Sequence, residues 1–293
     1  MNKVATLNND NIPSENLETE KIVASEQRKV AIQLNNISLC YQRKALFLFA
    51  KNKGMRKDRK FWALKDVSLT IFEGETIGVI GRNGSGKSTI SRVFCGALQP
   101  DSGEIHINGR AQLLALGIGF RPTMTGRENV MISGSLLGLS RREIKQRMND
   151  IEEFAELGDF FDEPIRTYSA GMRSRLGFAI STAVNPDILI LDEVMSTGDA
   201  SFRKKANERM DEMREKTKTV VVVSHNPGQL QELCSRVIWF EKGSLIMDGE
   251  VEEILPLYSQ FCKNPVKWAR ENSHLFSGLA STTGPSRQQS PDA

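Results

Sequence analysis

Gly81–Ser88 reads GRNGSGKS, which fits the pattern GxxxxGK[ST] of phosphate-binding loops. Glycines let the backbone wrap around a phosphate and turn its N–H groups inward. We expect Lys87 to bind the β- and γ-phosphates of a nucleotide, and the hydroxyl of Ser88 to ligate Mg²⁺. The flanking sequence predicts a strand over Glu75–Ile80 and a helix that continues through Leu98. Because this context fits, we interpret the stretch as a phosphate loop rather than an ordinary glycine-rich turn.

Two acids follow a second apolar run, ILIL, at residues 188–191. At the carboxyl end of a strand, Asp192 is placed to hold Mg²⁺ and Glu193 to polarise the attacking water. Many strands end in solvated acids, so it is the upstream phosphate loop that favours this interpretation.

Two further positions are candidates for phosphate contacts. Small residues follow Ser169 at the start of a predicted helix, where the positive end of the helix attracts anions. An ordinary N-cap serine is the alternative there. His225 follows the predicted strand Thr219–Ser224, and ligands gather at the carboxyl ends of parallel strands. A loop histidine with a local partner is the alternative for this position.

Strands and helices alternate along much of the chain, which indicates a parallel α/β sheet. A helical stretch from about 125 to 184 interrupts this alternation and is interpreted as an inserted subdomain. Thr125-x-x-Glu128 and Ser140-x-x-Glu143 have the form of capping boxes, so each predicts the start of a helix. The expected organisation is a disordered tail over 1–29, a domain over 30–262 with its helical subdomain at about 122–184, and a mostly disordered tail over 263–293.

The composition excludes several classes of protein. The 293 residues are 39% hydrophobic and 26% charged, as in ordinary globular proteins. The net charge of +3 is too small to indicate a nucleic-acid partner, and the four cysteines form no CxxC pair of a zinc or redox site. No apolar run approaches the roughly 20 residues of a membrane span, and the N-terminus lacks an apolar secretory signal. We therefore expect a cytoplasmic protein that reaches a membrane through a partner.

The order of these motifs resembles that of the ATP-binding subunit of an ABC transporter, over about residues 30–255. The resemblance implies an α/β P-loop NTPase core with an antiparallel β subdomain and an inserted α-helical signature subdomain. It also implies ATP and Mg²⁺ as cofactors. The expected assembly is a head-to-tail homodimer, in which two ATP molecules lie between the phosphate loop of one subunit and the signature helix of the other.

Matching positions take their roles from this family. Tyr41 would stack on adenine, Asp199 would contact the opposite subunit, and His225 would contact the γ-phosphate. Tyr168–Met172, YSAGM, is similar to the signature motif. The resemblance thus implies Glu193 and His225 as catalytic residues, Ser88 and Asp192 as metal ligands, and nucleotide contacts from Tyr41, Gly81, Arg82, Asn83, Gly84, Ser85, Gly86, Lys87, Ser88, Thr89, Ser169, Gly171 and Asp199.

Several segments narrow the resemblance to the polysaccharide-export ABC ATPases, which energise export of lipid-linked O-antigen, capsule or teichoic-acid chains. They are FWALKDVSL, GRNGSGKST, MTGRENV, LLGLSRREI, YSAGMRSRLGFA, LDEVMSTGDASF and VSHNPGQL. This implies a peripheral ATPase at the cytoplasmic face of the inner membrane, with an integral-membrane permease that handles the lipid-linked polysaccharide, and no nucleic acid. The alternatives are a drug-efflux or importer ATPase, a soluble ABC ATPase of translation or DNA repair, and a non-hydrolysing regulator.

The chain departs from the family at residues 119–123, GFRPT, where most ABC ATPases have a glutamine. Arg121 in this loop is either a solvated arginine or a contact to phosphate or the partner subunit, and Gln112 is not assigned the missing role. Ala170 replaces the glycine or serine of many signature motifs, which a helix start tolerates. The basic run Lys51–Lys60 either faces water or meets anionic lipid or the pyrophosphate of the substrate.

Overall fold

The structure is a computed structural model, and it describes residues 28–42, 60–114, 116–192 and 200–272. One of the two sheets in these ranges is antiparallel and has the order β2-β1-β4. Its strands are β1 (Val30–Gln42), β2 (Lys60–Phe72) and β4 (Ser102–Ile107). Fully buried side chains of this sheet, such as Ile37 and Leu64, pack in one core with Ile90 and Phe94. These last two belong to α2 (Lys87–Phe94), so the antiparallel sheet packs on the helix that follows the phosphate loop.

The second sheet has the order β5-β6-β7-β3-β8-β9 in the described part of the chain. Neighbouring strands are parallel except β8 and β9, which pair antiparallel. The valine run of β7 is buried along its whole length, as expected of a strand inside a parallel sheet. The strands are β3 (Thr76–Ile80), β5 (Ala111–Leu114), β6 (Ile188–Asp192), β7 (Thr219–Val223), β8 (Arg236–Glu241) and β9 (Ser244–Glu250).

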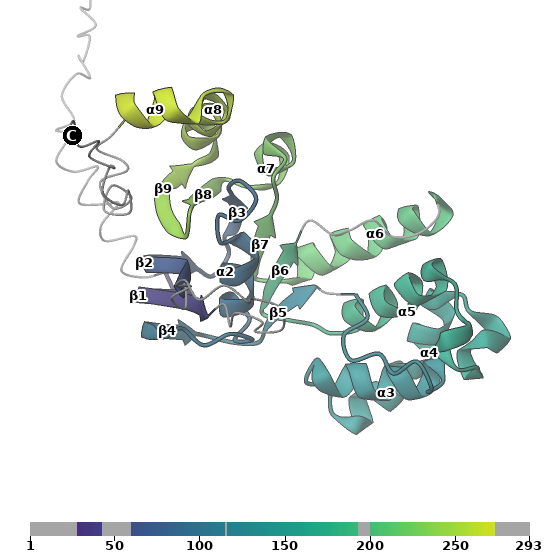
Figure 1. Ribbon diagram of the computed structural model, residues 1–293. Helices are drawn as coiled ribbons and strands as arrows, with labels where there is room; N and C mark the ends of the chain where they lie inside the picture. Colours follow the sequence, from purple (N-terminus) through teal and green to yellow (C-terminus); the bar gives the residue numbers. More distant parts are fainter. Residues whose placement is uncertain (1–27, 43–59, 115, 193–199, 273–293) are drawn as a thin grey trace, which may run out of the picture.

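A helical subdomain lies between β5 and β6 and extends away from both sheets (Figure 1). Both predicted capping boxes are confirmed, because Thr125 and Ser140 accept hydrogen bonds from the backbone N–H groups three residues later. The subdomain has its own apolar core, which includes the fully buried Val130, Ile144 and Phe161. Its elements are α3 (Gly126–Leu136), α4 (Arg141–Ala155), two 3-10 turns at Gly158–Asp162 and Ile165–Thr167, and α5 (Ala170–Thr182).

Helices α8 (Val251–Lys263) and α9 (Pro265–Glu271) end the described chain. The sequence places the start of a tail at residue 263, yet α9 lies beyond that point and buries Trp268, which is 5% exposed. The ring centroid of Trp268 lies 5.3 Å from that of Trp239 and 5.7 Å from that of Phe261. The local signal for α9 is its start, where Asn264 caps the helix and a proline occupies the first turn.

The architecture confirms the predicted α/β core with an antiparallel sheet and an inserted helical subdomain. Helix α6 (Ala200–Lys216) lies between β6 and β7 in the chain. Helix α7 (Pro227–Leu233) is missing from the sequence prediction, because its seven residues are too few to show a helical period. Over the described ranges, none of the helices combines the length and the apolar character that crossing a membrane requires.

Candidate nucleotide-binding site

The carboxyl ends of three strands lie level in the parallel part of the sheet. Asp192 of β6 pairs with Val223 of β7, which in turn pairs with Val79 of β3. The phosphate loop begins at Gly81, just past β3, and His225 lies just past β7. The register therefore brings the loop, the first acid of the Asp-Glu pair and the histidine to one edge of the sheet, as the sequence predicts.

Glycines shape the phosphate loop. Gly84 and Gly86 have φ values of 79° and 113°, in the left-handed region that favours glycine. A Cβ atom at Gly86 would lie 2.7 Å from the carbonyl oxygen of Ala63 in β2, so this position needs a glycine. A Cβ atom placed on Gly84 would have no neighbouring atom within 4 Å, so the space beside this residue is open. The hydroxyl of Ser85 is buried and has no partner among the described residues. These features fit a loop that encloses a phosphate.

Lys87 begins α2 and reaches back over the loop. Its Nζ donates to the carbonyl oxygens of Gly81 (2.6 Å) and Arg82 (3.2 Å). Burial lowers the pKa of this amine, and the carboxylate of Asp192 opposes that shift, so the two charges act on each other across the site. The first turn of α2 carries no acidic side chain, and Gly86 offers no side-chain cap. The N–H groups of this helix start are therefore available to an anion.

Ser88 and Asp192 fit the expected Mg²⁺ site in their chemistry. Ser88 is exposed in the first turn of α2, and burial raises the pKa of Asp192 while Lys87 and Arg92 lower it. The described part of the chain contains no group of three or more His, Cys, Asp or Glu side chains that could cage a metal ion. Mg²⁺ bound to a nucleotide uses one or two protein ligands together with phosphate oxygens and water. A hydroxyl and a carboxylate beside a phosphate loop suit that coordination.

Two predicted residues lie outside the described residues. Glu193, the expected general base, follows Asp192 directly, and Asp199 precedes α6. Their roles therefore stay predictions. His225 is described: it is exposed, and it lies between β7 and Asn226, whose side chain caps α7 by accepting from the N–H of Gly228 (3.0 Å).

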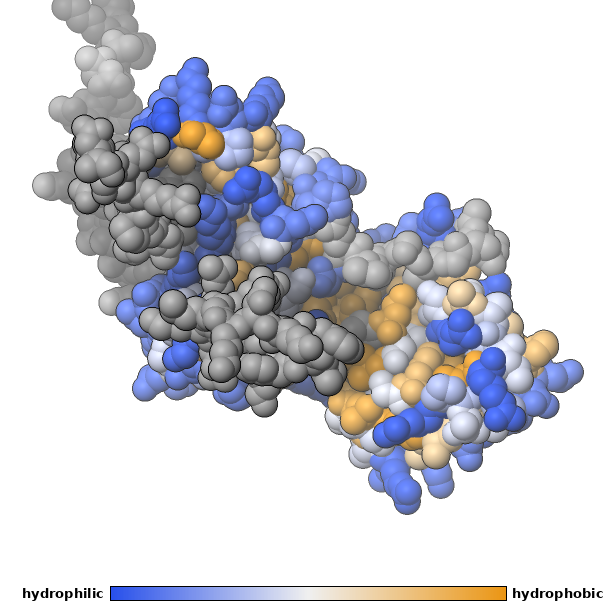
Figure 2. All heavy atoms as spheres, in the orientation of Figure 1, coloured by the Kyte–Doolittle hydropathy of each residue, from blue (hydrophilic) through white to orange (hydrophobic). Residues whose placement is uncertain are grey.

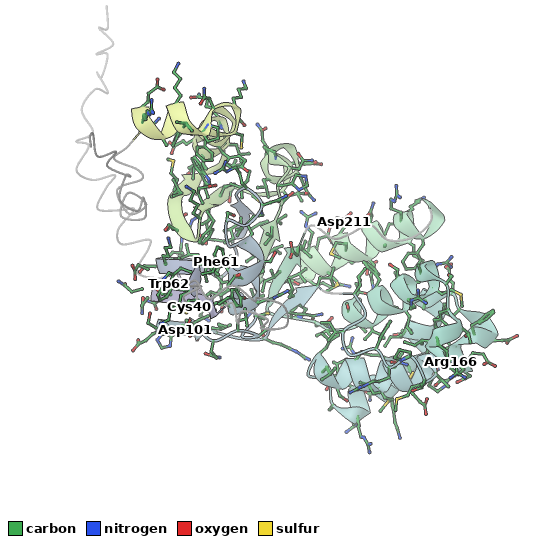
Figure 3. All side chains as sticks on the ribbon, viewed as in Figure 1. Cys40, Phe61, Trp62, Asp101, Arg166 and Asp211 are labelled. Atoms are coloured by element: carbon green, nitrogen blue, oxygen red, sulfur yellow. The ribbon has the colours of Figure 1, made fainter. Side chains whose placement is uncertain are left out.

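Tyr41 lies in an exposed aromatic group at the end of the antiparallel sheet. It is 40% exposed and pairs in register with Phe61, which is 53% exposed. Trp62, labelled with Phe61 in Figure 3, is 41% exposed. The next residue of β2, Ala63, lies beside the phosphate loop, because its carbonyl oxygen occupies the space where a Cβ atom on Gly86 would be. An adenine stacked on Tyr41 would thus lie beside the loop, and the sequence alone did not single out Phe61 or Trp62.

The signature residues are held in the helical subdomain, away from the phosphate loop of the same chain (Figure 1). Ser169 is the N-cap of α5, and its hydroxyl accepts from the N–H of Met172 at 3.1 Å. A Cβ built at Gly171 meets nothing closer than the Ser169 hydroxyl at 3.8 Å. Packing within the chain therefore does not require this glycine, and the start of α5 is open to an outside group.

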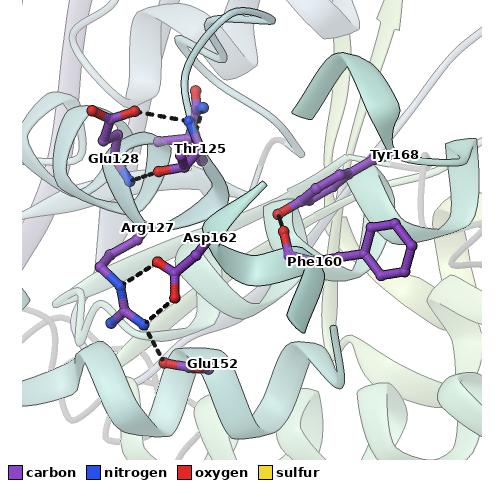
Figure 4. A network of polar contacts seen from close by, with 8 residues as sticks. Thr125, Arg127, Glu128, Glu152, Phe160, Asp162 and Tyr168 are labelled. Carbon is purple, nitrogen blue, oxygen red and sulfur yellow. Dashed lines mark hydrogen bonds and ion pairs between the residues drawn. The ribbon is translucent and has the colours of Figure 1, made fainter. Parts of the chain in front are cut away.

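A polar network fixes the subdomain behind the signature (Figure 4). Arg127 donates from Nε to Asp162 (2.7 Å) and from Nη2 to Asp162 (3.0 Å) and Glu152 (3.2 Å). The hydroxyl of Tyr168 donates to the carbonyl oxygen of Phe160 at 2.5 Å, and burial raises the pKa of this tyrosine to about 12. The tyrosine of the YSAGM segment is thus held in the core of the subdomain, directly before the N-cap of α5.

Arg121 and Gln112 have different surroundings. The backbone N–H of Arg121 donates to Oδ1 of Asn129 (2.7 Å), and its guanidinium is exposed and has no partner among the described residues. Gln112 is buried in β5 and donates to the carbonyl oxygen of Ser181 (2.9 Å), which binds the sheet to α5. In the basic run 51–60, residues 51–59 lie outside the described residues, and Lys60 is exposed.

Arg82 is a loop residue whose side chain forms an ion pair with a residue far away in the sequence. Its guanidinium bonds to the carboxylate of Glu241, at the end of β8. Sequence reasoning missed this partner, because the two residues are 159 positions apart and neither forms part of a motif with the other.

Comparisons with known proteins agree with this geometry. The sequence model of the family described as ABC transporter matches residues 64–196. The teichoic acids export ATP-binding protein TagH of Staphylococcus haemolyticus is 40% identical over 255 residues, which cover 84% of this chain and 95% of that protein. The O-antigen export system ATP-binding protein RfbB of Klebsiella pneumoniae is 47% identical over 205 residues, 70% of this chain and 83% of the relative. This chain spans 62% of the TagH proteins of two Listeria strains.

A solved structure shows the same fold. The ATP-binding cassette MJ0796, described as a dimer in a post-hydrolysis state with ADP and Pi bound, superposes with a TM-score of 0.58. It is 24% identical and matches 75% of this chain and 98% of its own.

Proposed function

This chain belongs to the ABC transporter family, as an ATPase of the polysaccharide-export group, and we propose that it drives a lipid-linked polysaccharide of the O-antigen, capsule or teichoic-acid type across the inner membrane. The observation that carries the proposal is the strand register, in which β3, β6 and β7 end side by side. The phosphate loop, Asp192 and His225 therefore lie at the same edge of the sheet. The relatives named for teichoic-acid and O-antigen export supply the class of substrate.

In the proposed reaction, the chain positions ATP and stabilises the charge that develops on the transferred phosphoryl group. Lys87 leaves the carbonyl oxygens of Gly81 and Arg82 and turns to the β- and γ-phosphates. The loop and the start of α2 supply N–H donors to the same oxygens. Ser88 and Asp192 would hold Mg²⁺, which neutralises phosphate charge when bound. Glu193 orients the attacking water and His225 contacts the γ-phosphate.

The proposal includes a head-to-tail dimer of two such chains. Helix α5 belongs to the helical subdomain, which extends away from both sheets, and space is open around Gly171 at its start. In the dimer it contacts the ATP bound to the other subunit, and Asp199 contacts that subunit at the same interface. Each ATP is then held by two chains, so binding closes the dimer and hydrolysis reopens it. The ADP-bound cassette MJ0796 is itself described as a dimer.

A membrane-embedded permease is the proposed second partner, at the cytoplasmic face. Figure 2 shows apolar surface gathered on the helical subdomain. The exposed apolar side chains there include Ile118, Met124 and Leu136, at 37%, 39% and 62% exposure. They lie on the loop that carries Arg121 and on α3, beside that loop. Apolar side chains of this kind mark a surface for a protein partner. Through it, opening and closing of the dimer would move the permease.

The test is the variant Glu193→Gln in the native host, with polysaccharide stained at the cell surface and inside the cell. We expect surface polymer to be lost and polymer to accumulate inside. The matched control is Glu208→Gln, an exposed glutamate on α6, which should leave both stains unchanged. Normal surface polymer in the Glu193 variant would overturn the substrate class and favour another ABC transporter, such as a drug exporter or an importer.

A further inference from the structure

The side chain of Arg82 is directed from the phosphate loop toward helix α8. Its Nε donates to both carboxylate oxygens of Glu241, at 3.2 and 3.1 Å, and Nη2 donates to Oε1 as well. The guanidinium carbon lies 4.9 Å from the centroid of the Phe261 ring. A residue of the loop is thus held by a strand end on one side and by an aromatic ring of α8 on the other.

The partners of Arg82 are themselves fixed. Glu241 is 3% exposed and Phe261 is 2% exposed. A buried carboxylate needs a cationic or hydrogen-bonding partner, so Glu241 holds the guanidinium tightly. The Phe261 ring packs 5.0 Å from the centroid of Trp239 and 5.7 Å from that of Trp268. The ring is therefore packed against aromatic side chains of β8 and α9.

The backbone of Arg82 lies at the centre of the loop. Its carbonyl oxygen accepts from the N–H of Ser85 (3.1 Å) and from Nζ of Lys87 (3.2 Å). The turn after β8 also binds the loop, because the N–H of Gly243 donates to the carbonyl oxygen of Ser85 at 2.8 Å. The contacts of the Arg82 side chain thus also restrain its backbone carbonyl group. That carbonyl group positions Lys87 before Lys87 binds a phosphate.

We propose that Arg82 is a positioning residue of the ATPase site, and that helix α8 sets the affinity of the phosphate loop for ATP through the contacts of Arg82 with Phe261 and Glu241. The inference rests on the proposed ATPase function. A loop that is already ordered loses less conformational freedom when it binds its ligand, so releasing Arg82 weakens ATP binding. Once ATP is bound, its phosphates hold Lys87 in place of the carbonyl oxygen of Arg82, so kcat at saturating ATP is preserved.

The test is Phe261→Leu in the full-length chain, measured by binding of a fluorescent ATP analogue and by phosphate release. Loss of the ring contact should raise Kd and the KM for ATP about three- to thirtyfold, with kcat within about twofold of the original. Phe261→Tyr keeps the ring and should restore the original KM. Ile254→Ala removes a buried side chain of the same helix without a contact to Arg82, so it should lower Tm but leave KM unchanged.

A double variant separates the proposed route from general loss of packing. In the Arg82→Ala background, Phe261→Leu should raise KM no further, because the contact is already gone. Glu241→Gln replaces Phe261→Leu if the latter fails to fold, and should also raise KM. An unchanged KM in both single variants, or independent effects in the double variant, would overturn the inference. If the original chain neither binds the analogue nor releases phosphate, the proposed function fails as well.

Discussion

Lys87 at the start of α2 and Asp192 at the end of β6 interact electrostatically at the carboxyl edge of the parallel sheet. The charge of each opposes the shift that burial gives to the pKa of the other. The two residues are brought together by the register of three strands, in which Asp192, Val223 and Val79 lie in one row. A cation for phosphate and an anion for Mg²⁺ are thus in place before either ligand arrives. Such prior placement is the main contribution a protein makes to phosphoryl transfer.

Asp192→Asn should increase the Mg²⁺ concentration needed for hydrolysis. The amide keeps the size of the side chain but removes the charge that would attract the metal ion. We expect phosphate release by the original chain to stop in EDTA and to return on Mg²⁺ addition. The variant should need at least about tenfold more Mg²⁺, as found when a ligand or its support is lost at metal sites. The control is Asp159→Asn, at an exposed position, which should show the Mg²⁺ dependence of the original chain. If Asp192→Asn also shows that dependence, Asp192 is not a ligand of Mg²⁺.

Gly171→Asp should block the ATP-dependent dimer without damaging the fold. The position has free space around a built Cβ, and an acidic residue is favourable in the first turn of a helix. Its charge would instead repel the phosphates of ATP on the other subunit. In a Glu193→Gln background, size-exclusion chromatography with ATP should show a dimer, and adding Gly171→Asp should return the monomer. A dimer that persists would show that the start of α5 does not contact nucleotide.

Tyr41→Ala should weaken ATP binding, whereas Tyr41→Phe should not. Stacking of an aromatic ring on a base contributes about 1–3 kcal/mol, so the expected rise in Kd is about five- to 150-fold. Binding of inorganic triphosphate, which has no base, should be equal in the original chain and in both variants. A proportional loss of triphosphate binding in Tyr41→Ala would indicate damage to the loop instead of loss of stacking.

Tyr168→Phe should cost stability at neutral pH but not at high pH. The hydroxyl donates to the carbonyl oxygen of Phe160, a bond that contributes about 1 kcal/mol. Burial raises the pKa of Tyr168 from 10.0 to about 12, so the unfolded chain loses its proton first as pH rises. The stabilising effect is therefore complete below pH 10 and declines toward pH 12. Urea unfolding of both proteins from pH 8 upward measures this difference, and a constant difference would contradict the structure.

Local sequence patterns predicted most of the fold and much of the site. The phosphate loop, both capping boxes and the buried runs of β6 and β7 each depend on neighbouring residues, so their spacing is visible in the chain. Long-range relationships were not visible. The pairing of Arg82 with Glu241 and the packing of Trp268 on Trp239 depend on how distant segments meet. Neither leaves a periodic pattern or a motif.

The most direct measurement is phosphate release by this chain together with the proposed permease, with and without Lys87→Ala. Removing the cation that turns from the loop carbonyls to the phosphates should lower kcat/KM by about 100- to 1000-fold, the effect of losing one transition-state donor. Lys267→Ala, an exposed lysine of α9, should keep the original rate. If Lys87→Ala hydrolyses ATP as fast as the original chain, the phosphate loop is not the catalytic site and the account is wrong.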